Sequence, residues 1–189
     1  MPPKCKFTKQ EVVQAALEMT RESGINSVTA RALGERLGSS SRPIFSLFQS
    51  MQEVQQEVMQ AANALYQDYL ARDMAAGEYP VYKASGMAYI RFAKEETELF
   101  KLLFMRDRST EQIENNLNEL RPLIEIIMKN TGLSEQDAYM LHLGMWVYVH
   151  GIATMIATSY LEWDWNTISQ MLTDGFEGLK TRFLGKEPK

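Results

Sequence analysis

Cysteine is almost absent from this chain, since Cys5 is the only one among 189 residues. A single thiol forms no internal disulfide and no cysteine-rich zinc site, and such usage is typical of a reducing compartment. Eleven glycines and six prolines are too few for a collagen-like or linker-like chain. The first ten residues also lack the apolar run of a signal peptide. We therefore expect a cytoplasmic protein.

The chain also has no excess of positive charge, because its formal net charge is −4. The chain as a whole is not a polycation that coats nucleic acid. Residues 1–50 nevertheless contain seven Lys/Arg and four Asp/Glu, or +3, while the other 139 contain thirteen and twenty, or −7. A local basic surface is enough to bind phosphates with release of counterions. A difference this small is equally compatible with chance, so charge alone decides neither way.

Strict alternation of apolar and polar residues is scarce, and apolar residues recur at helical spacing instead. A composition of 45% hydrophobic and 23% charged residues is that of a globular protein. The pattern predicts an all-α fold with nine to ten helices. A first helix should lie between Thr8 and Gly24, a short one between Thr29 and Gly38, and another should carry Ile44 and Phe48. Longer helices are expected at about 51–76, 81–94, 96–106, 110–130 with Pro122 as a bend or break, 135–158 and 165–184.

The stretch 30–49 has the spacing of a helix-turn-helix. Two helices that cross steeply need a small residue at the crossing, a turn residue that accepts positive φ, and an apolar anchor in the second helix. Gly34, Gly38 and Ile44 occupy these places. Any helical hairpin of an all-α protein could produce the same spacing, so the pattern favours a DNA-binding unit without establishing it.

A resemblance to a known family adds to this pattern. The segment from Phe7 to about Met59 resembles the N-terminal domain of the tetracycline-repressor (TetR) family, and Trp146-x-x-x-His150-Gly151 is similar to a C-terminal domain found in a subset of it. Together they cover most of the chain. The matching residues are Val13-x-x-Ala16-Leu17, Gly24-Ile25-x-x-Val28-Thr29-x-x-Ala32-Leu33, Leu37-Gly38, Ile44-Phe45-x-x-Phe48, Ser50, and Phe92-Ala93-x-Glu95-x-x-x-Leu99-Phe100-x-Leu102-Leu103-Phe104.

The resemblance implies a homodimeric transcriptional regulator with a DNA-binding domain at 7–54 and a helical ligand-binding and dimerisation domain at 55–185. Arg42 is the only basic residue on the expected recognition helix, which makes it the best candidate for a bidentate contact to guanine. Arg31 and the arm residues Lys4, Lys6 and Lys9 are expected to touch the DNA backbone. The DNA-binding residues carried over from the family are Lys6, Thr29, Arg31, Ser40, Ser41, Arg42, Pro43, Phe45 and Ser46.

Two positions depart from the family pattern. Many members have tyrosine where Phe45 stands and lysine where Met51 stands, and both commonly contact phosphate. Phe45 has no hydroxyl group and Met51 has no charge, so we expect weaker or more arm-dependent DNA binding with a shallow salt dependence.

The domain at 55–185 is rich in methionine and aromatic residues, which suit an adaptable apolar pocket. The same residues also fit a helical core, and His150 can equally be a pocket's polar group or a satisfied core histidine. The residues expected in the pocket are Tyr66, Tyr69, Phe92, Phe100, Leu103, Phe104, Met128, Trp146 and His150.

Residues 140–161 are long and apolar enough for a membrane span, but no Lys or Arg flanks them closely. A helix that is apolar on nearly all faces fits a place between a bundle core and a dimer interface. We therefore predict no membrane association. The residues expected in the interface are Val149, Ile152, Ile156, Ile168, Leu172, Phe176, Leu179 and Phe183.

Motifs for catalysis and metal binding are missing, since the sequence has neither HExxH nor a Ser/His/Asp arrangement. We expect no enzyme and no cofactor. The sequence predicts a regulator, most simply a repressor, that binds a palindromic double-stranded operator and is released by a small hydrophobic or aromatic effector. The alternative is a helical module that binds hydrophobic ligands and has weak or lost DNA binding.

Overall fold

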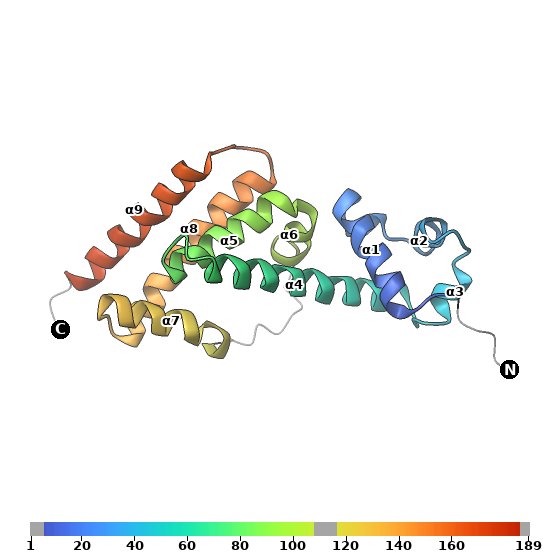
Figure 1. Cartoon of the computed structure of the whole chain (residues 1–189), viewed down its shortest axis with the longest axis horizontal. Helices are drawn as coiled ribbons and strands as arrows, with labels where there is room; N and C mark the ends of the chain where they lie inside the picture. The colour runs from blue at the N-terminus through green and yellow to red at the C-terminus, as the bar shows by residue number, and fades with distance from the viewer. Residues whose placement is uncertain (1–5, 108–116, 186–189) are drawn as a thin grey trace. The chain divides into compact units, whose positions relative to one another are not determined.

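The computed structural model describes residues 6–107 and 117–185, and within these ranges the chain forms nine α-helices, one short 3-10 helix and no strand (Figure 1). The prediction of an all-α fold is confirmed. The helices are α1 (Lys9–Ser23), α2 (Ala30–Arg36), α3 (Arg42–Phe45), α4 (Met51–Ala75), α5 (Val81–Glu95), α6 (Thr97–Phe104), α7 (Leu117–Thr131), α8 (Glu135–Ala157) and α9 (Trp165–Leu184), with the 3-10 turn η1 at Ile25–Ser27.

The chain divides into two compact units. The head unit comprises Met1–Asp68 together with Glu95–Arg106, and the body unit comprises Tyr69–Lys94 together with Asp107–Lys189. Helix α6 therefore belongs to the same unit as α1, α2 and α3, although residues 46–96 separate it from α3 along the chain. The domain boundaries of 7–54 and 55–185 remain a sequence prediction beside this division.

Local capping explains why the first helix begins and ends where it does. Thr8 Oγ1 accepts a hydrogen bond from the Glu11 amide at 3.1 Å, and the Thr8 amide donates to the Glu11 carboxylate at 2.8 Å. This reciprocal box satisfies amides that have no partner inside the helix. At the other end Gly24 has φ 77° and its amide donates to the Thr20 carbonyl. The predicted start and stop of this helix are both confirmed.

The helix predicted at 110–130 differs from the expectation. Residues 110–116 lie outside the described part of the chain, and α7 runs from Leu117 to Thr131 without interruption at Pro122. Of the predicted bend or break at this residue, the break is therefore wrong. A proline removes one amide donor from the helix, and Pro122 lies at an exposed position in the helix.

Helix α8 is the centre of the body unit, because α7 and α9 both pack against it. Gly144 shows how closely α9 approaches, since a Cβ atom at this position would lie 2.9 Å from Leu179 Cδ1. By length and composition alone α8 could cross a membrane, with a mean hydropathy of 1.3. Core helices of globular proteins have the same character, and α8 buries eight of its residues within the chain.

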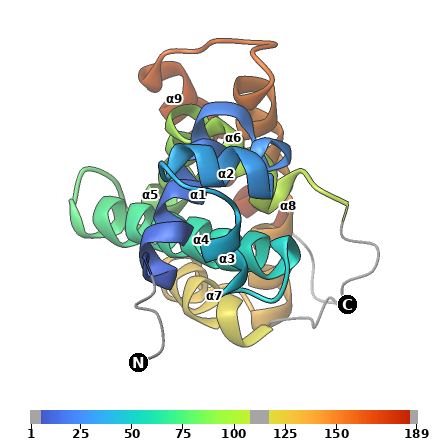
Figure 2. The same cartoon turned by 90° about the vertical axis from the view of Figure 1, so that its right-hand side faces the viewer.

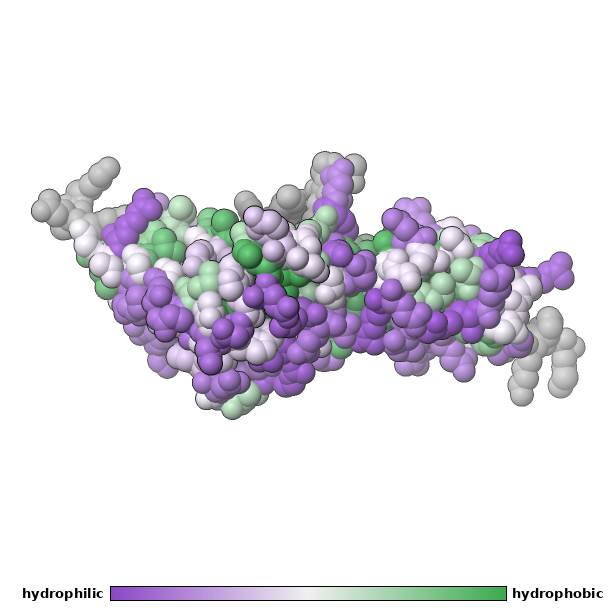
Figure 3. Space-filling model, turned by 90° about the horizontal axis from the view of Figure 1, so that it is seen from above, coloured by the Kyte–Doolittle hydropathy of each residue, from purple (hydrophilic) through white to green (hydrophobic). Residues whose placement is uncertain are grey.

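Polar residues dominate the surface in the view that Figure 3 gives, with smaller apolar patches between them. The large side chains with the least exposure come from both units and include Phe92, Phe100, Leu33, Ile44, Met87 and Leu141. Each unit therefore has apolar side chains of its own to bury.

Candidate nucleic-acid interface and ligand-binding body

Helices α2 and α3 form the predicted helix-turn-helix, and the loop between them can be followed in Figure 2. Thr29 caps α2 by accepting a hydrogen bond from the Ala32 amide at 3.2 Å. Gly34 lies against the backbone of the turn, because a Cβ atom there would stand 2.9 Å from the Ser40 carbonyl carbon. Gly38 has φ 61°, and Ile44 is completely buried. The three roles predicted from the spacing are thus confirmed.

The recognition helix is shorter than the sequence indicated. The helix itself is Arg42–Phe45, with Ser41 and Ser46 at its two ends. Ser40 precedes it, and Phe48, which was predicted to lie on the same helix, follows it. Phe48 is still buried, and its amide donates to the Ile44 carbonyl at 2.9 Å, so one further turn continues the direction of the helix.

Arg42 differs from the other basic residues of the helix-turn-helix region. It is exposed and forms no hydrogen bond or ion pair with any residue of the described chain. The remaining described Lys and Arg side chains between 6 and 50 all have partners. Lys6 donates to the Gly38 carbonyl, Lys9 pairs with Glu53, Arg21 with Glu18 and Glu96, Arg31 with Glu35, and Arg36 with Glu22. Lys4 and Cys5 lie outside the described residues.

The two departures from the family pattern lie on either side of the turn before α4. Phe45 is 49% exposed, and Met51, the first residue of α4, is half-buried. Lys9 contributes a cation nearby, because its ammonium group pairs with Glu53 in the first turn of α4 at 3.0 Å. The Gln49 amide also donates to Glu53, and these two contacts lower the pKa of the Glu53 carboxyl.

The other described members of the predicted DNA-contacting set lie at the surface of the helix-turn-helix. Thr29, Arg31, Ser40 and Ser46 are exposed, whereas Ser41 and Pro43 are half-buried. The Ser46 hydroxyl donates to the Pro43 carbonyl at 2.6 Å. The set is therefore accessible, with Arg42 and Phe45 its largest side chains without a described ion pair.

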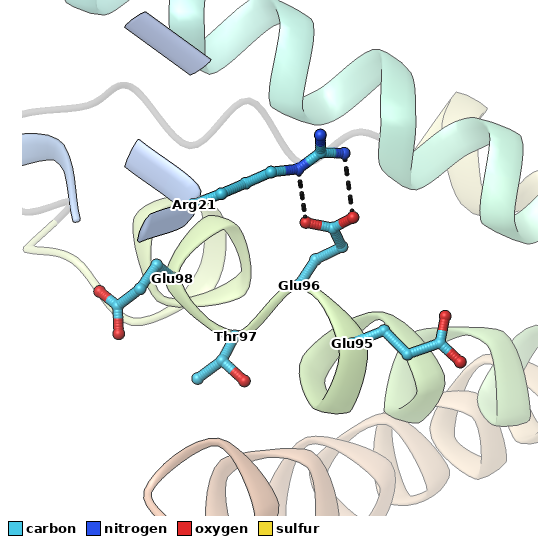
Figure 4. A pocket seen from close by; sticks show the side chains of 5 residues that line it. All are labelled: Arg21, Glu95, Glu96, Thr97 and Glu98. Atoms are coloured by element: carbon cyan, nitrogen blue, oxygen red, sulfur yellow. Dashed lines mark hydrogen bonds and ion pairs between the residues drawn. The ribbon is translucent and has the colours of Figure 1, made fainter. Parts of the chain in front are cut away.

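An ion pair joins α1 to α6 inside the head unit. Arg21 donates from Nε and Nη2 to the two carboxylate oxygens of Glu96 at 2.8 and 3.0 Å (Figure 4). Both residues border an open cleft of about 510 Å³ that Glu95, Thr97 and Glu98 also line. None of the side chains predicted to form the ligand pocket lines this cleft. The sequence offered no sign of the pair, because its two residues are 75 positions apart.

The side chains predicted to form a ligand pocket separate into two groups. In the head unit Tyr66 meets Phe104 edge-to-face with ring centroids 5.1 Å apart, and Phe104 lies beside the buried Phe100, while Leu103 of the same helix is also buried. Burial raises the pKa of the Tyr66 hydroxyl. In the body unit Tyr69 meets the buried Phe92, Trp146 stacks on His150, and Met128 is half-buried in α7.

Both histidines of the chain pair with tyrosines across α5 and α8. Tyr82 Oη lies 3.0 Å from His142 Nδ1, and Tyr89 Oη lies 2.8 Å from His150 Nδ1. Burial lowers the pKa of each imidazole. In the neutral imidazole with its proton on Nε2, the tyrosine hydroxyl donates to Nδ1. The tyrosines stand two helical turns apart, as do the histidines, and this matching spacing was the signal that sequence reasoning missed.

Most residues predicted to form a dimer interface are buried within the single chain. Val149, Ile152, Ile168, Leu172 and Phe183 are buried within the single chain. Ile156, Phe176 and Leu179 are half-buried, and Leu179 contacts Gly144 of α8. The five buried residues belong to the core of the body unit, and the assignment of the set to an interface stays a prediction. A different stripe of α8 is exposed, which includes Met140, Val147 and Met155.

Within the described ranges, no group of three or more His, Cys, Asp or Glu side chains is arranged to hold a metal ion.

Comparisons with known proteins agree with this architecture. Residues 82–176 match a family model described as "Tetracyclin repressor-like, C-terminal domain". A protein described as an uncharacterized HTH-type transcriptional regulator, YobS, of Bacillus subtilis (strain 168) is 23% identical over 165 residues, which cover 86% of this chain and 85% of the relative. The crystal structure of a TetR-like transcriptional regulator from Rhodococcus sp. RHA1 aligns with a TM-score of 0.64 and 15% identity, covering 94% of this chain and 96% of the other.

The fold and the helix-turn-helix define the class, which is that of helical DNA-binding transcription regulators. Because the family model spans half of the sequence, the chain belongs to the TetR family.

Proposed function

We propose that this protein is a homodimeric, ligand-responsive regulator, most simply a repressor, that leaves a palindromic operator when a small apolar or aromatic molecule binds its body. The observation that carries the proposal is the state of Arg42. An exposed guanidinium without a described partner, on the second helix of a helix-turn-helix, is suited to a bidentate contact with guanine O6 and N7. A regulator of this kind works beside the DNA, so we place it in the cytoplasm.

The paired cations of the head unit support different roles in DNA binding for Arg31 and Arg36 on one hand and for Arg42 on the other. Arg31 and Arg36 are engaged with Glu35 and Glu22, so each must exchange a carboxylate for a phosphate when it approaches DNA. Such exposed pairs are weak because water screens them, and exchange is feasible. The net gain per phosphate is smaller than for a free cation. Base reading by Arg42 then provides a larger share of the affinity.

The exposed stripe of α8 supports the dimer. Met140, Val147 and Met155 are each at least 37% exposed, and they follow one another at spacings of seven and eight residues, which places them on one side of the helix. Gly151 lies between the last two, and a Cβ atom there would meet nothing within 4 Å. A stripe of large apolar side chains around a glycine permits close packing of a second copy of α8. The partner helices then sit on the face opposite the core residues Val149 and Ile152.

The body unit supports the binding of a hydrophobic effector. Trp146 is 51% exposed and stacks on His150 with ring centroids 5.6 Å apart. An exposed indole beside an imidazole offers an aromatic surface with a polar neighbour, and this combination suits a small aromatic ligand. The ligand must prefer one of two conformations of the dimer for its binding to change operator affinity.

Selection from a pool of random duplexes with the purified full-length protein tests the proposal. An enriched palindrome with half-sites about 34–36 Å apart, one helical turn, is expected for a dimer that places α3 in successive major grooves. Enrichment of a single unpaired half-site would contradict the dimer. The absence of any enriched sequence would contradict the regulator and favour the alternative, a helical module that binds hydrophobic ligands without reading DNA.

A further inference from the structure

Phe45 is an exposed aromatic side chain on the helix that is proposed to read DNA. Among the described residues of the head unit, Phe45 at 49% and Met105 at 38% are the large apolar side chains that are exposed. The neighbouring apolar side chains are not exposed, since Ile44, which precedes it, is completely buried and Phe48, which follows the helix, is 2% exposed. The core of the helix-turn-helix is therefore complete without the Phe45 ring. The ring is available for a partner outside the chain.

The position of Phe45 relative to Arg42 indicates where this partner lies. The two residues are three positions apart on α3, and side chains at this spacing are neighbours on one helix face, about 5–6 Å apart at Cβ. Both are exposed. A base pair adds about 3.4 Å of rise along DNA, so a ring beside the guanidinium would lie one or two base pairs from the guanine that Arg42 contacts.

The chemistry of the ring excludes most of what a DNA groove offers. A phenyl ring has no donor for a phosphate or for a base acceptor, and contact with a phosphate would remove water from an anion without compensation. The 5-methyl group of thymine is the apolar feature of the major-groove edge. Removal of both the methyl group and the ring from water is favourable.

We propose that Phe45 is a specificity-determining residue that contacts the 5-methyl group of a thymine next to the guanine read by Arg42. The inference rests on the proposed function, because it requires that α3 enters the major groove. Phe45 then carries sequence information, whereas a tyrosine at this place in related proteins commonly contacts phosphate. The selected operator contains this thymine at the same distance from the guanine in each half-site.

Replacement of single thymines by deoxyuridine tests the contact, because the change removes only the methyl group and keeps base pairing. The duplex is the palindrome obtained by selection with the full-length protein. Each half-site should contain one such thymine. Replacing it in a single half-site should weaken binding by about fourfold, the effect expected for burial of one methyl group. Replacement in both half-sites should weaken binding by roughly 15-fold. The other thymines should show little change.

Variants of the protein connect this effect to the ring. Phe45→Ala should bind the thymine and deoxyuridine duplexes equally, while Phe45→Leu, which keeps an apolar side chain, should retain part of the difference. Gln49→Ala is the matched control, since Gln49 is exposed nearby and contacts Glu53 through its backbone amide, and it should retain the full difference. Circular dichroism checks that each variant is folded.

The outcomes separate this proposal from the proposed function. A palindrome that binds tightly but shows no deoxyuridine effect, or an effect that persists in Phe45→Ala, overturns the thymine contact and leaves the regulator intact. A failure to select any duplex overturns both. An equal loss of affinity for Phe45→Ala on the operator and on random DNA assigns the ring to the fold or to the DNA backbone, and this too overturns the proposal.

Discussion

The guanidinium of Arg21 in α1 faces the carboxylate of Glu96, at the start of α6, through two hydrogen bonds of 2.8 and 3.0 Å. The side chains are only 31% and 14% exposed, so the pair is shielded more than the other ion pairs of the helix-turn-helix region. Glu98, two residues further, approaches Gly24 at the end of α1, where a Cβ atom would lie 2.9 Å from Glu98 Oε2. The two contacts attach α6 to α1, the helix against which α2 of the helix-turn-helix packs.

Loss of this pair should destabilise the protein. Arg21→Ala leaves a largely buried carboxylate without its main partner, and we expect a decrease of about 1–3 kcal/mol in the free energy of unfolding. Denaturant unfolding followed by circular dichroism measures it. Arg31→Ala is the control, because Arg31 pairs with Glu35 at a side-chain exposure of 90% and 65% and should cost at most about 0.5 kcal/mol. Equal effects of the two substitutions would show that the Arg21 pair does not stabilise α6 on α1.

Arg42 should contribute to specificity more than to general affinity. Arg42→Ala should cost about 1–3 kcal/mol on the selected operator and little on random duplexes, if the guanidinium reads a base. Fluorescence anisotropy with both duplexes at the same salt concentration gives the two values. An equal loss on both would assign Arg42 to phosphate binding.

The salt dependence of operator binding should be shallow. Five described cations of the helix-turn-helix region are already held by carboxylates or a carbonyl, and two phosphate-contacting groups of the family are absent at Phe45 and Met51. Few counterions are therefore released per half-site. The slope of log K against log salt concentration measures this. A slope that corresponds to something like ten phosphates per dimer would contradict the prediction.

The histidines should make stability dependent on pH in a defined window. Burial lowers the pKa of His142 and His150 below the value of the unfolded chain, about 6.5. The unfolded state therefore binds more protons, and the stability gained from neutral histidines is complete above pH 6.5 and is lost as the pH falls through the lowered folded pKa values. Urea unfolding between about pH 5 and 7.5 measures this loss.

The double variant His142→Gln, His150→Gln is the comparison for that series. The pH dependence of its free energy of unfolding should lack the contribution of the histidines and keep the contribution of the carboxylates. Parallel curves for the two proteins would show that the histidines do not titrate differently in the folded state.

A charge on the exposed stripe of α8 should dissociate the dimer. Val147 is 64% exposed in the single chain, and Val147→Glu would place a carboxylate in an apolar interface at a cost of at least about 2 kcal/mol, or roughly 30-fold in the dissociation constant. Analytical ultracentrifugation at several concentrations tests this. Gln170→Glu, at an exposed position of α9, is the matched control and should leave the association unchanged. A monomeric Gln170→Glu, or an unaffected Val147→Glu, would place the interface elsewhere.

The sequence alone was sufficient wherever neighbours along the chain set the structure. The cap at Thr8 and Glu11 joins residues three positions apart, and the helix-turn-helix depends on Gly34, Gly38 and Ile44 within one short segment. A left-handed turn or a close crossing admits few residue types, so these positions were informative by themselves. The division into many helices followed from apolar periodicity in the same way.

Tertiary structure decided which groups meet and which faces are covered. Helix α8 is apolar on nearly all sides, so periodicity could not distinguish the core residues Val149 and Ile152 from the exposed Val147 and Met155. The choice depended on where α7 and α9 pack. Likewise only the fold brings Glu96 to Arg21 and Glu22 to Arg36, because the partners lie far apart in the sequence. The net charge of a segment is a sum over residues, whereas the charge available to DNA depends on distances, and those are properties of the folded chain.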